Sequence, residues 1–308
     1  MPQPFRPRAE EEALVLVHDG SWDGLLTAVY AAYTGPALPG RVDGPDCQQA
    51  FGKTYREVET DGQKAARVRA GITRTLGGAV YDAAWTAFLA GDPGCSNAVY
   101  QYLRLGFESG REAYRRLSDD RVIAVNKRDS LVRREASHLL QFVRFSQRAG
   151  GVYYAAITPE YPVLPLIMPH FAARFRTQPF VLHDLRHRQA GVSSPREWVI
   201  ADASGLTVPD PTAGEQAFQR LWKTFYDSVA IPERANPQLR RQLMPKKFWP
   251  HLPEMTLLPD DPETLPLRAA PRRLPEQEWA APAALEGERG LTGKERGANG
   301  CVPGSGEE

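Results

Sequence analysis

The chain has 308 residues, of which 42% are apolar and 24% charged, and its 38 Lys and Arg nearly balance its 37 Asp and Glu. This composition is typical of a soluble globular protein. No apolar run approaches the roughly 20 residues that cross a membrane, and the opening residues do not form a secretion signal. The three cysteines, Cys47, Cys95 and Cys301, lie far apart. Their spacing excludes iron–sulfur, zinc-ribbon and disulfide-rich folds and favours a cytoplasmic location.

The charge is distributed unevenly along the chain. Residues 104–251 contain 23 Lys and Arg against 14 Asp and Glu, a local charge of +9, whereas the remainder carries 15 against 23. A basic region of this kind is either a solvated surface or a surface that attracts a polyanion such as nucleic acid. The charge alone leaves both interpretations open.

The first half of the chain has mainly helical periodicity. Residues 1–12 are polar and Pro-rich, so we expect a flexible N-terminus, and the apolar run 13–17 predicts a short buried strand. Apolar residues at helical spacing between Trp22 and Tyr33 predict an amphipathic helix. Residues 35–45 contain three prolines and three glycines, which predict a break. Helical periodicity then continues from about 61 to 140.

The second half is richer in β-forming residues. Strands are predicted at 142–145, 152–157, 180–183 and 198–200, and helices at 164–175 and 215–229. This order predicts an α+β fold with a mostly helical first half and a small antiparallel sheet of about four strands. We expect one domain over 13–257, with a helical part at 13–140 and a strand-rich part at 141–257. Residues 258–308 lack periodicity and are expected to form a disordered tail.

The common nucleotide-binding, nucleophile-elbow and zinc-protease motifs do not occur in the sequence. His183 and His187 have an i, i+4 spacing, but this stretch begins in a predicted strand, where that spacing does not make a metal site. The sequence therefore predicts no cofactor and no metal. Several polar residues could still converge on one site near the end of the sheet, and these are Asp19, Ser21, Arg144, His170, Arg174, Asp184, Arg234 and Asn236.

Structural roles explain some of these residues equally well. Asp19 and Ser21 can cap the helix that follows them, which competes with a nucleophilic role for Ser21. His170 and Arg174 lie one helical turn apart and could hold a phosphate. The alternative to a phosphate site is structural: His170 packs at the start of its helix and Arg174 pairs with a carboxylate.

Residues 222–254 combine basic and aromatic side chains. Residues 220–251 hold seven basic groups against two acidic ones. Cations bind phosphates and aromatic rings stack on unpaired bases, so we predict a nucleic-acid or partner-binding edge. Pro245 and Pro250 should interrupt regular helix and display this edge on a loop. Its predicted residues are Arg240, Arg241, Lys246, Lys247 and Trp249.

Five motifs along residues 14–254 carry a family resemblance. They are Asp19-Gly-Ser-x-x-Gly-Leu-Leu-Thr-Ala-Val29, Phe142-Val-Arg-Phe145, Leu164-Pro-Leu-Ile-Met-Pro-His-Phe-Ala-Ala-Arg174, Lys223-Thr-Phe-Tyr-Asp-Ser-Val-Ala-Ile-Pro-Glu-Arg-x-Asn-Pro237 and Met244-Pro-Lys-Lys-Phe-Trp-Pro-His-Leu-Pro-Glu254. In this order they resemble a bacterial family labelled "probable DNA metabolism protein".

The resemblance implies a role beside a radical-SAM protein that is thought to modify or repair DNA, and in some members a fusion to uracil-DNA glycosylase. It assigns no catalytic residue. The roughly 50 residues after Glu254 are too few for a glycosylase domain and lack the cysteines of the iron–sulfur glycosylases. Any uracil excision would therefore need a separate protein.

Three functions remain open at this point. The first is a DNA-repair accessory protein that binds nucleic acid, a radical-SAM partner, or both. The second is an enzyme acting on nucleic acid, a hydrolase or glycosylase, with a polar site at the sheet end. The third is a purely structural adaptor with an incidental basic face.

Overall fold

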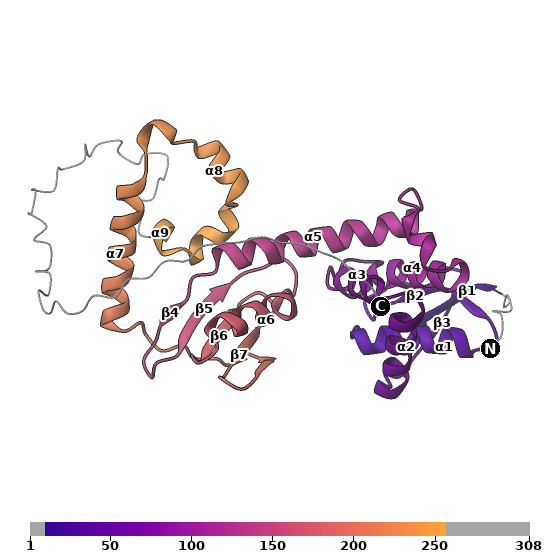
Figure 1. Ribbon diagram of the computed structural model, residues 1–308. Helices are drawn as coiled ribbons and strands as arrows, with labels where there is room; N and C mark the ends of the chain where they lie inside the picture. Colours follow the sequence, from indigo (N-terminus) through magenta and orange to yellow (C-terminus); the bar gives the residue numbers. More distant parts are fainter. Residues whose placement is uncertain (1–9, 257–308) are drawn as a thin grey trace, which may run out of the picture. The chain divides into compact units, whose positions relative to one another are not determined.

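The computed structural model describes residues 10–256 and begins with a small parallel sheet (Figure 1). Its strand order is β2-β1-β3, with β1 (Glu10–Val17) between β2 (Leu38–Asp43) and β3 (Thr54–Glu57). The predicted strand at 13–17 is therefore confirmed and starts three residues earlier. Helix α1 (Trp22–Thr34) connects β1 to β2 as a βαβ unit, and the predicted helix at 22–33 is confirmed.

Strand β2 lies inside the stretch that the sequence predicted to be irregular, and that prediction was wrong. Leu38 and Val42 are buried, although a proline and a glycine stand between them. A Cβ on Gly40 would lie 2.6 Å from the Glu12 carbonyl oxygen, so the glycine permits close approach of β2 to β1. Proline is tolerated because β2 is an edge strand.

Helices fill the chain between the two sheets, as the periodicity predicted. They are α2 (Gly62–Thr75), α3 (Gly78–Phe88), α4 (Cys95–Ser109), the 3-10 helix η1 (Arg111–Arg115) and α5 (Asp120–Phe142). Asp61 caps α2 and Asp119 caps α5 through their carboxylates. Helix α5 belongs to two hydrophobic clusters, because Val122 and Val125 pack in the first and Val132 packs in the second.

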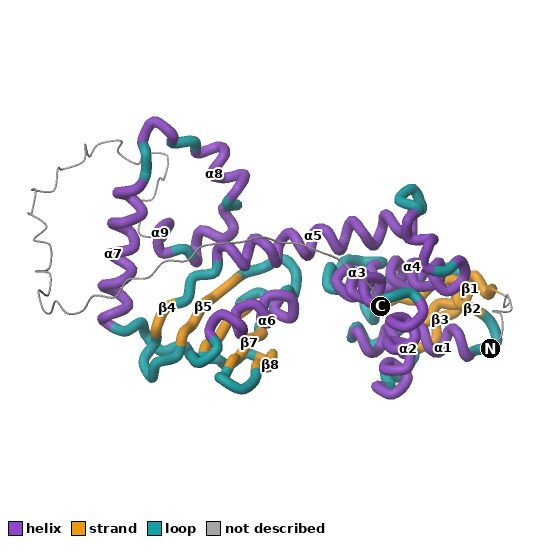
Figure 2. Tube along the Cα trace, viewed as in Figure 1, coloured by secondary structure: helices purple, strands orange, loops and turns teal. Residues whose placement is uncertain are grey.

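The second sheet has five strands in the order β4-β5-β6-β7-β8 (Figure 2). They are β4 (Ser146–Gln147), β5 (Tyr153–Ile157), β6 (Phe180–Asp184), β7 (Gln189–Ser193) and β8 (Trp198–Asp202). Helix α6 (Leu164–Phe175) connects β5 to β6, which are parallel, and the other neighbours are antiparallel. Ile167 and Phe171 of α6 pack in one buried cluster with Phe180 and Leu182 of β6.

The predicted fold class is confirmed: helices dominate the first half and a sheet forms in the second. Two details differ. The sheet is mixed rather than antiparallel, because the α6 crossover makes β5 and β6 parallel. The predicted strand at 142–145 is wrong, since α5 continues to Phe142 and Phe145 inserts among Phe171, Phe175 and Phe180.

The last described segment consists of short elements after a longer helix. They are α7 (Ala213–Val229), η2 (Pro232–Arg234), α8 (Pro237–Leu243), η3 (Lys246–His251) and α9 (Pro253–Thr256). The predicted helix at 215–229 is confirmed as α7. The predicted tail at 258–308 lies outside the described residues. Between residues 10 and 256, no helix has the length and apolarity to cross a bilayer.

Candidate functional site

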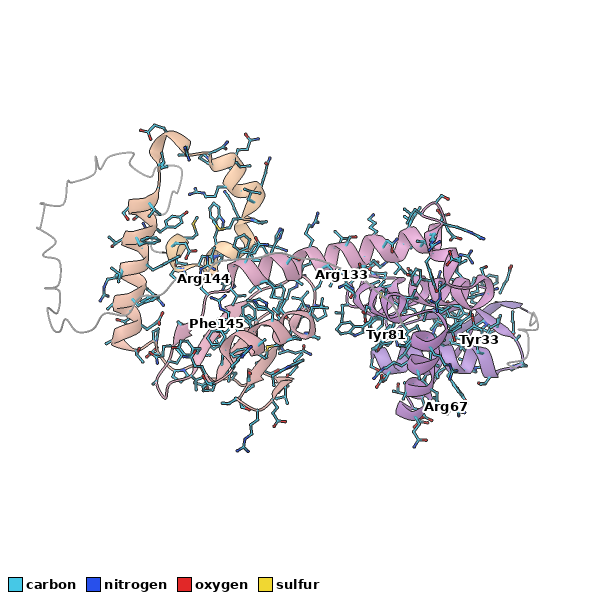
Figure 3. The ribbon with its side chains drawn as sticks, viewed as in Figure 1. Tyr33, Arg67, Tyr81, Arg133, Arg144 and Phe145 are labelled. Carbon is cyan, nitrogen blue, oxygen red and sulfur yellow. The ribbon has the colours of Figure 1, made fainter. Side chains whose placement is uncertain are left out.

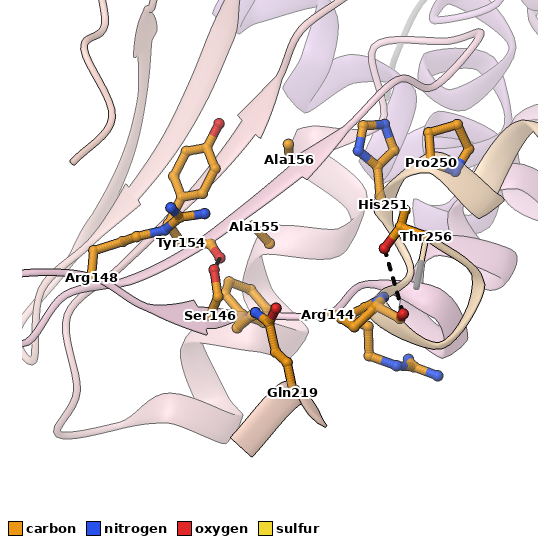
Figure 4. A pocket seen from close by; sticks show the side chains of 12 residues that line it. Arg144, Ser146, Arg148, Tyr154, Ala155, Ala156, Gln219, Pro250, His251 and Thr256 are labelled. Carbon is orange, nitrogen blue, oxygen red and sulfur yellow. Dashed lines mark hydrogen bonds between the residues drawn. The ribbon is translucent and has the colours of Figure 1, made fainter. Parts of the chain in front are cut away.

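A cleft of about 200 Å³ opens beside β4 and β5 (Figure 4). Its walls come from three separate stretches of the chain: residues 144–156, Gln219 of α7, and residues 250–256. The twelve lining residues are Arg144, Phe145, Ser146, Arg148, Tyr154, Ala155, Ala156, Gln219, Pro250, His251, Pro253 and Thr256. None of these twelve side chains is acidic.

Arg148 and Tyr154 form one wall of the cleft. The Arg148 guanidinium lies over the Tyr154 ring, 5.1 Å from its centroid, and its Nη1 donates to the Pro209 carbonyl oxygen. Arg148 Nε is buried and finds no hydrogen-bond partner among the described residues. No carboxylate in the described part of the chain forms an ion pair with Arg148, so its charge remains available to an anion.

A hydrogen bond to the neighbouring strand fixes the Tyr154 ring. Its hydroxyl shares a 3.0 Å hydrogen bond with His183 Nδ1 on the neighbouring strand β6. Burial raises the pKa of Tyr154 and lowers the pKa of His183, so both side chains are neutral at pH 7. This pair holds the aromatic ring in place and adds no charge to the cleft.

Arg144 has a structural partner. Its Nη2 donates to Glu254 Oε1 at 3.0 Å, and Trp222 Nε1 donates to the other carboxylate oxygen at 3.1 Å. Glu254 is only 3% exposed, so these two bonds join α7, α9 and the start of the second sheet. Arg144 and Phe145 thus serve different contacts, one binding Glu254 and the other entering the aromatic core (Figure 3).

His251 closes the opposite wall. Its Nε2 lies 3.1 Å from Thr158 Oγ1, and burial lowers the pKa of this histidine. The ring is therefore neutral at pH 7 and acts as a hydrogen-bonding group. Ser146 Oγ donates to the Tyr154 carbonyl oxygen and Gln219 Nε2 donates to Glu215, so Arg148 is the group that makes the cleft suited to bind an anion. The lining contains no carboxylate that could serve as a general base.

The predicted basic edge is only partly open to a ligand. The Arg240 guanidinium and Lys246 Nζ lie 5.5 and 5.7 Å from the Trp249 ring centroid, and Trp249 Nε1 donates to the Met244 carbonyl oxygen. The edge lies on α8 and the short helix η3 rather than on a loop. Arg241 is half-buried on α8.

Lys247 forms an ion pair with a carboxylate 112 residues earlier in the sequence. Its Nζ pairs with Glu135, whose side chain is 3% exposed and also accepts the backbone N–H groups of Glu160 and Tyr161. This carboxylate fixes the turn that leads into α6. The sequence reasoning treated Lys247 as a surface cation, and it missed this contact because no local pattern links the two residues.

Asp19 and Ser21 act through local geometry, as the capping interpretation predicts. Ser21 Oγ accepts the Gly24 N–H, while Asp19 accepts from the Ser21 N–H, the Ser21 hydroxyl and the Thr60 hydroxyl. Gly24 is required because a Cβ there would lie 2.1 Å from Asp19 Oδ1. The Asp-Gly-Ser-x-x-Gly motif thus encodes a turn and a helix start.

A buried His18–Ser96 pair was missed by the sequence reasoning. His18 Nε2 lies 2.9 Å from Ser96 Oγ, which has the geometry of a nucleophile and its base. The Gly20 N–H, however, donates to His18 Nδ1, so the proton of the neutral ring sits on Nε2 and points at the serine. His18 therefore donates to Ser96 and cannot accept its proton in this arrangement.

The remaining predicted polar residues lie on different elements. His170 and Arg174 are exposed on α6, and Asn236 caps α8 by accepting the Leu239 N–H. Arg234 is exposed at the end of η2. Asp184 is fully buried and accepts from the Arg186 and His187 N–H groups and from His187 Nδ1. Among these predicted polar residues, only Arg144 lines the cleft.

No group of three or more His, Cys, Asp or Glu in the described part of the chain is arranged to hold an ion. His183 instead bonds Tyr154, and His187 bonds Asp184.

Comparison with known proteins places this region in a family. A family model described as a domain of unknown function, DUF4130, matches residues 93–254. That range includes every lining residue of the cleft except Thr256. A search of curated proteins found no match. Because the family model covers more than half of the sequence, the chain belongs to the DUF4130 family.

Proposed function

We propose that this chain is a cytoplasmic nucleic-acid-binding accessory protein of DNA metabolism, and that the cleft binds the phosphate backbone. Arg148 carries the proposal, because its guanidinium has a buried Nε without a partner and no ion pair among the described residues, and because no side chain that lines the cleft is acidic. Guanidinium groups are among the groups that contact phosphate oxygens in protein–DNA complexes. Ten of the twelve lining residues also lie within residues 104–251, whose local charge is +9.

The pairing of Arg148 with Tyr154 supports a nucleic acid over a small inorganic anion. A guanidinium over a tyrosine ring brings a charge and an aromatic ring together in one place. Unstacked bases in single strands bind to such planes, whereas bases inside a duplex are covered by their neighbours. We therefore expect a single-stranded segment to bind better than a duplex.

The family resemblance supplies the proposed partners. We infer that the chain works beside a radical-SAM protein that modifies or repairs DNA. We also infer that a separate uracil-DNA glycosylase carries out any base excision. Co-purification of the chain with its radical-SAM neighbour, with and without DNA, tests this part of the proposal. Separate elution under both conditions would contradict it.

The experiment that tests nucleic-acid binding uses Arg148→Ala. Binding of a fluorescein-labelled single-stranded oligonucleotide is followed by anisotropy at several salt concentrations. Loss of one phosphate contact should flatten the slope of log affinity against log salt by about 0.7. Arg74→Ala removes an exposed arginine from α2, far from the cleft residues in sequence, and should leave the slope unchanged.

Two results would contradict the proposal. One is that the wild-type chain does not bind the oligonucleotide at low salt. The other is that Arg148→Ala and Arg74→Ala have the same slope as wild type while both variants are folded by circular dichroism.

A further inference from the structure

Helix α7 leaves an apolar stripe open to solvent. Phe218, Leu221, Phe225 and Val229 follow one another at i, i+3, i+7 and i+11, so they lie on one side of the helix. They are 61, 66, 53 and 56% exposed, and none of the 17 residues of α7 is buried. Isolated exposed apolar side chains are ordinary, but a continuous stripe marks an interaction surface.

The stripe is not the side by which α7 attaches to its own chain. Trp222 donates to Glu254, and Glu215 accepts the Gln147 N–H, so the side of the helix that carries these two residues faces the sheet and α9. At 3.6 residues per turn, the stripe lies next to that side and remains uncovered by the described residues.

Charge is excluded from the stripe and its outer border. The charged residues Arg220, Lys223 and Asp227 fall on the opposite side of the helix, where Lys223 and Asp227 form an ion pair. The outer border consists of the small uncharged residues Ala217, Thr224 and Ser228. Small side chains at these positions allow another helix to approach closely.

We propose that this stripe binds a second copy of the same chain and forms a two-fold symmetric dimer. In a two-fold interface the same patch meets itself, so a charged patch would repel its own image. An uncharged stripe avoids this repulsion, and charge-depleted apolar surfaces are typical of homodimer interfaces. An antiparallel pairing of the two helices would place Phe218 against the partner's Val229.

The stripe supplies about half of the area that a stable dimer needs. Its four side chains expose on the order of 400 Å², taking the usual areas of such side chains, whereas a stable interface buries about 800 Å² per partner. The remainder would come from the small residues of the outer border and from Ile231, Leu239 and Leu243, which follow along the chain and are 50, 47 and 65% exposed.

The test is the mass of the full chain in solution by sedimentation equilibrium between about 1 and 100 μM. The wild-type chain should have twice the 34.2 kDa chain mass in the upper part of this range. Leu221→Glu places a carboxylate in the centre of the stripe and should weaken the dimer at least about 100-fold. Gln216→Glu adds the same charge on the opposite side of α7 and should leave the mass unchanged.

Each other outcome overturns the proposal. A wild-type chain that stays monomeric at 100 μM does not form this dimer. If removal of residues 257–308 then produced a dimer, those residues would be the segment that covers the stripe in the full chain. A dimer that survives in folded Leu221→Glu uses another surface. Because Leu221 is mostly exposed, this variant should keep its circular dichroism spectrum and Tm. This inference does not depend on nucleic-acid binding.

Discussion

Removal of the Glu135 carboxylate should destabilise the protein more than most surface changes. In Glu135→Ala, the partly buried N–H groups of Glu160 and Tyr161 lose a charged acceptor, which costs about 1.5 kcal/mol for each group. Lys247 also loses its partner, but its side chain is 42% exposed and this loss adds little. We therefore expect the free energy of unfolding to fall by about 3 kcal/mol. For a chain of this size, Tm should fall by about 6–12 °C.

The measurement is urea unfolding followed by circular dichroism at 222 nm, together with Tm by calorimetry. Lys247→Met keeps most of the side-chain volume, leaves Glu135 bonded to the two N–H groups, and should cost only about 1 kcal/mol. Glu112→Ala is the control, because its ion pair with Arg115 is exposed and should contribute at most about 0.5 kcal/mol. A Glu135→Ala variant within about 0.5 kcal/mol of wild type would refute the anchoring role.

Three further predictions concern the first sheet. Gly24→Ala should lower the free energy of unfolding by about 1–3 kcal/mol, because the added Cβ displaces Asp19. Its control is Gly71→Ala in α2, where an added Cβ has no neighbour within 4 Å. In urea unfolding, this control should be neutral or stabilising by up to about 1 kcal/mol. Ser21→Ala should cost about 1 kcal/mol in the same assay, and an unchanged value would remove Ser21 as a cap. Burial lowers the pKa of His18 below its usual 6.5. Below pH 6.5, His18 therefore binds a proton more readily in the unfolded chain than in the folded chain. The stability that neutral His18 provides should be present above pH 6.5 and should decrease as the pH falls below 6.5. Tm measured on both sides of pH 6.5 should depend less on pH in His18→Gln than in wild type, and equal dependence would contradict the assignment.

Strands made of continuous apolar and aromatic runs were predictable, and strands that contain glycine were not. Residues 13–17, 152–157, 180–183 and 198–200 have clear β patterns and correspond to β1, β5, β6 and β8. Strands β2 and β7 contain Gly40 and Gly191; residues 35–45 were predicted to be a break, and no strand was predicted at 189–193. A Cβ on Gly191 would lie 2.2 Å from Met168 Sδ, so this glycine is needed for α6 to approach the sheet. Only the three-dimensional packing reveals that requirement.

The parallel pairing of β5 and β6 was also not predicted. The helix at 164–175 was predicted between these two strands, and such a crossover is the usual connection between parallel strands. The antiparallel expectation came from the separation of helices and strands into two halves. The local β5-α6-β6 order was the better guide.

The candidate site was harder to predict than the fold. The cleft combines Arg148 and Tyr154 with His251, about 100 residues later, and no spacing in the sequence links them. The basic and aromatic density at 240–249 drew attention to Lys247 and Trp249 instead. Those two side chains make internal contacts with Glu135 and the Met244 carbonyl oxygen. Composition marks the basic region but does not show which of its cations make internal contacts.

The most direct test of nucleic-acid binding by the cleft is to add one negative charge at its rim. Thr256 lines the cleft and is exposed, and Thr256→Glu removes only the bonds of its hydroxyl to the carbonyl oxygens of Leu252 and Pro253 in the preceding turn. Anisotropy with a single-stranded oligonucleotide at low salt should show affinity lower by about 5- to 10-fold, as expected for one repulsive surface charge. Thr73→Glu makes the same change on the exposed surface of α2 and should bind like wild type. Equal affinity of Thr256→Glu, Thr73→Glu and wild type would contradict the assignment of the cleft as the binding site.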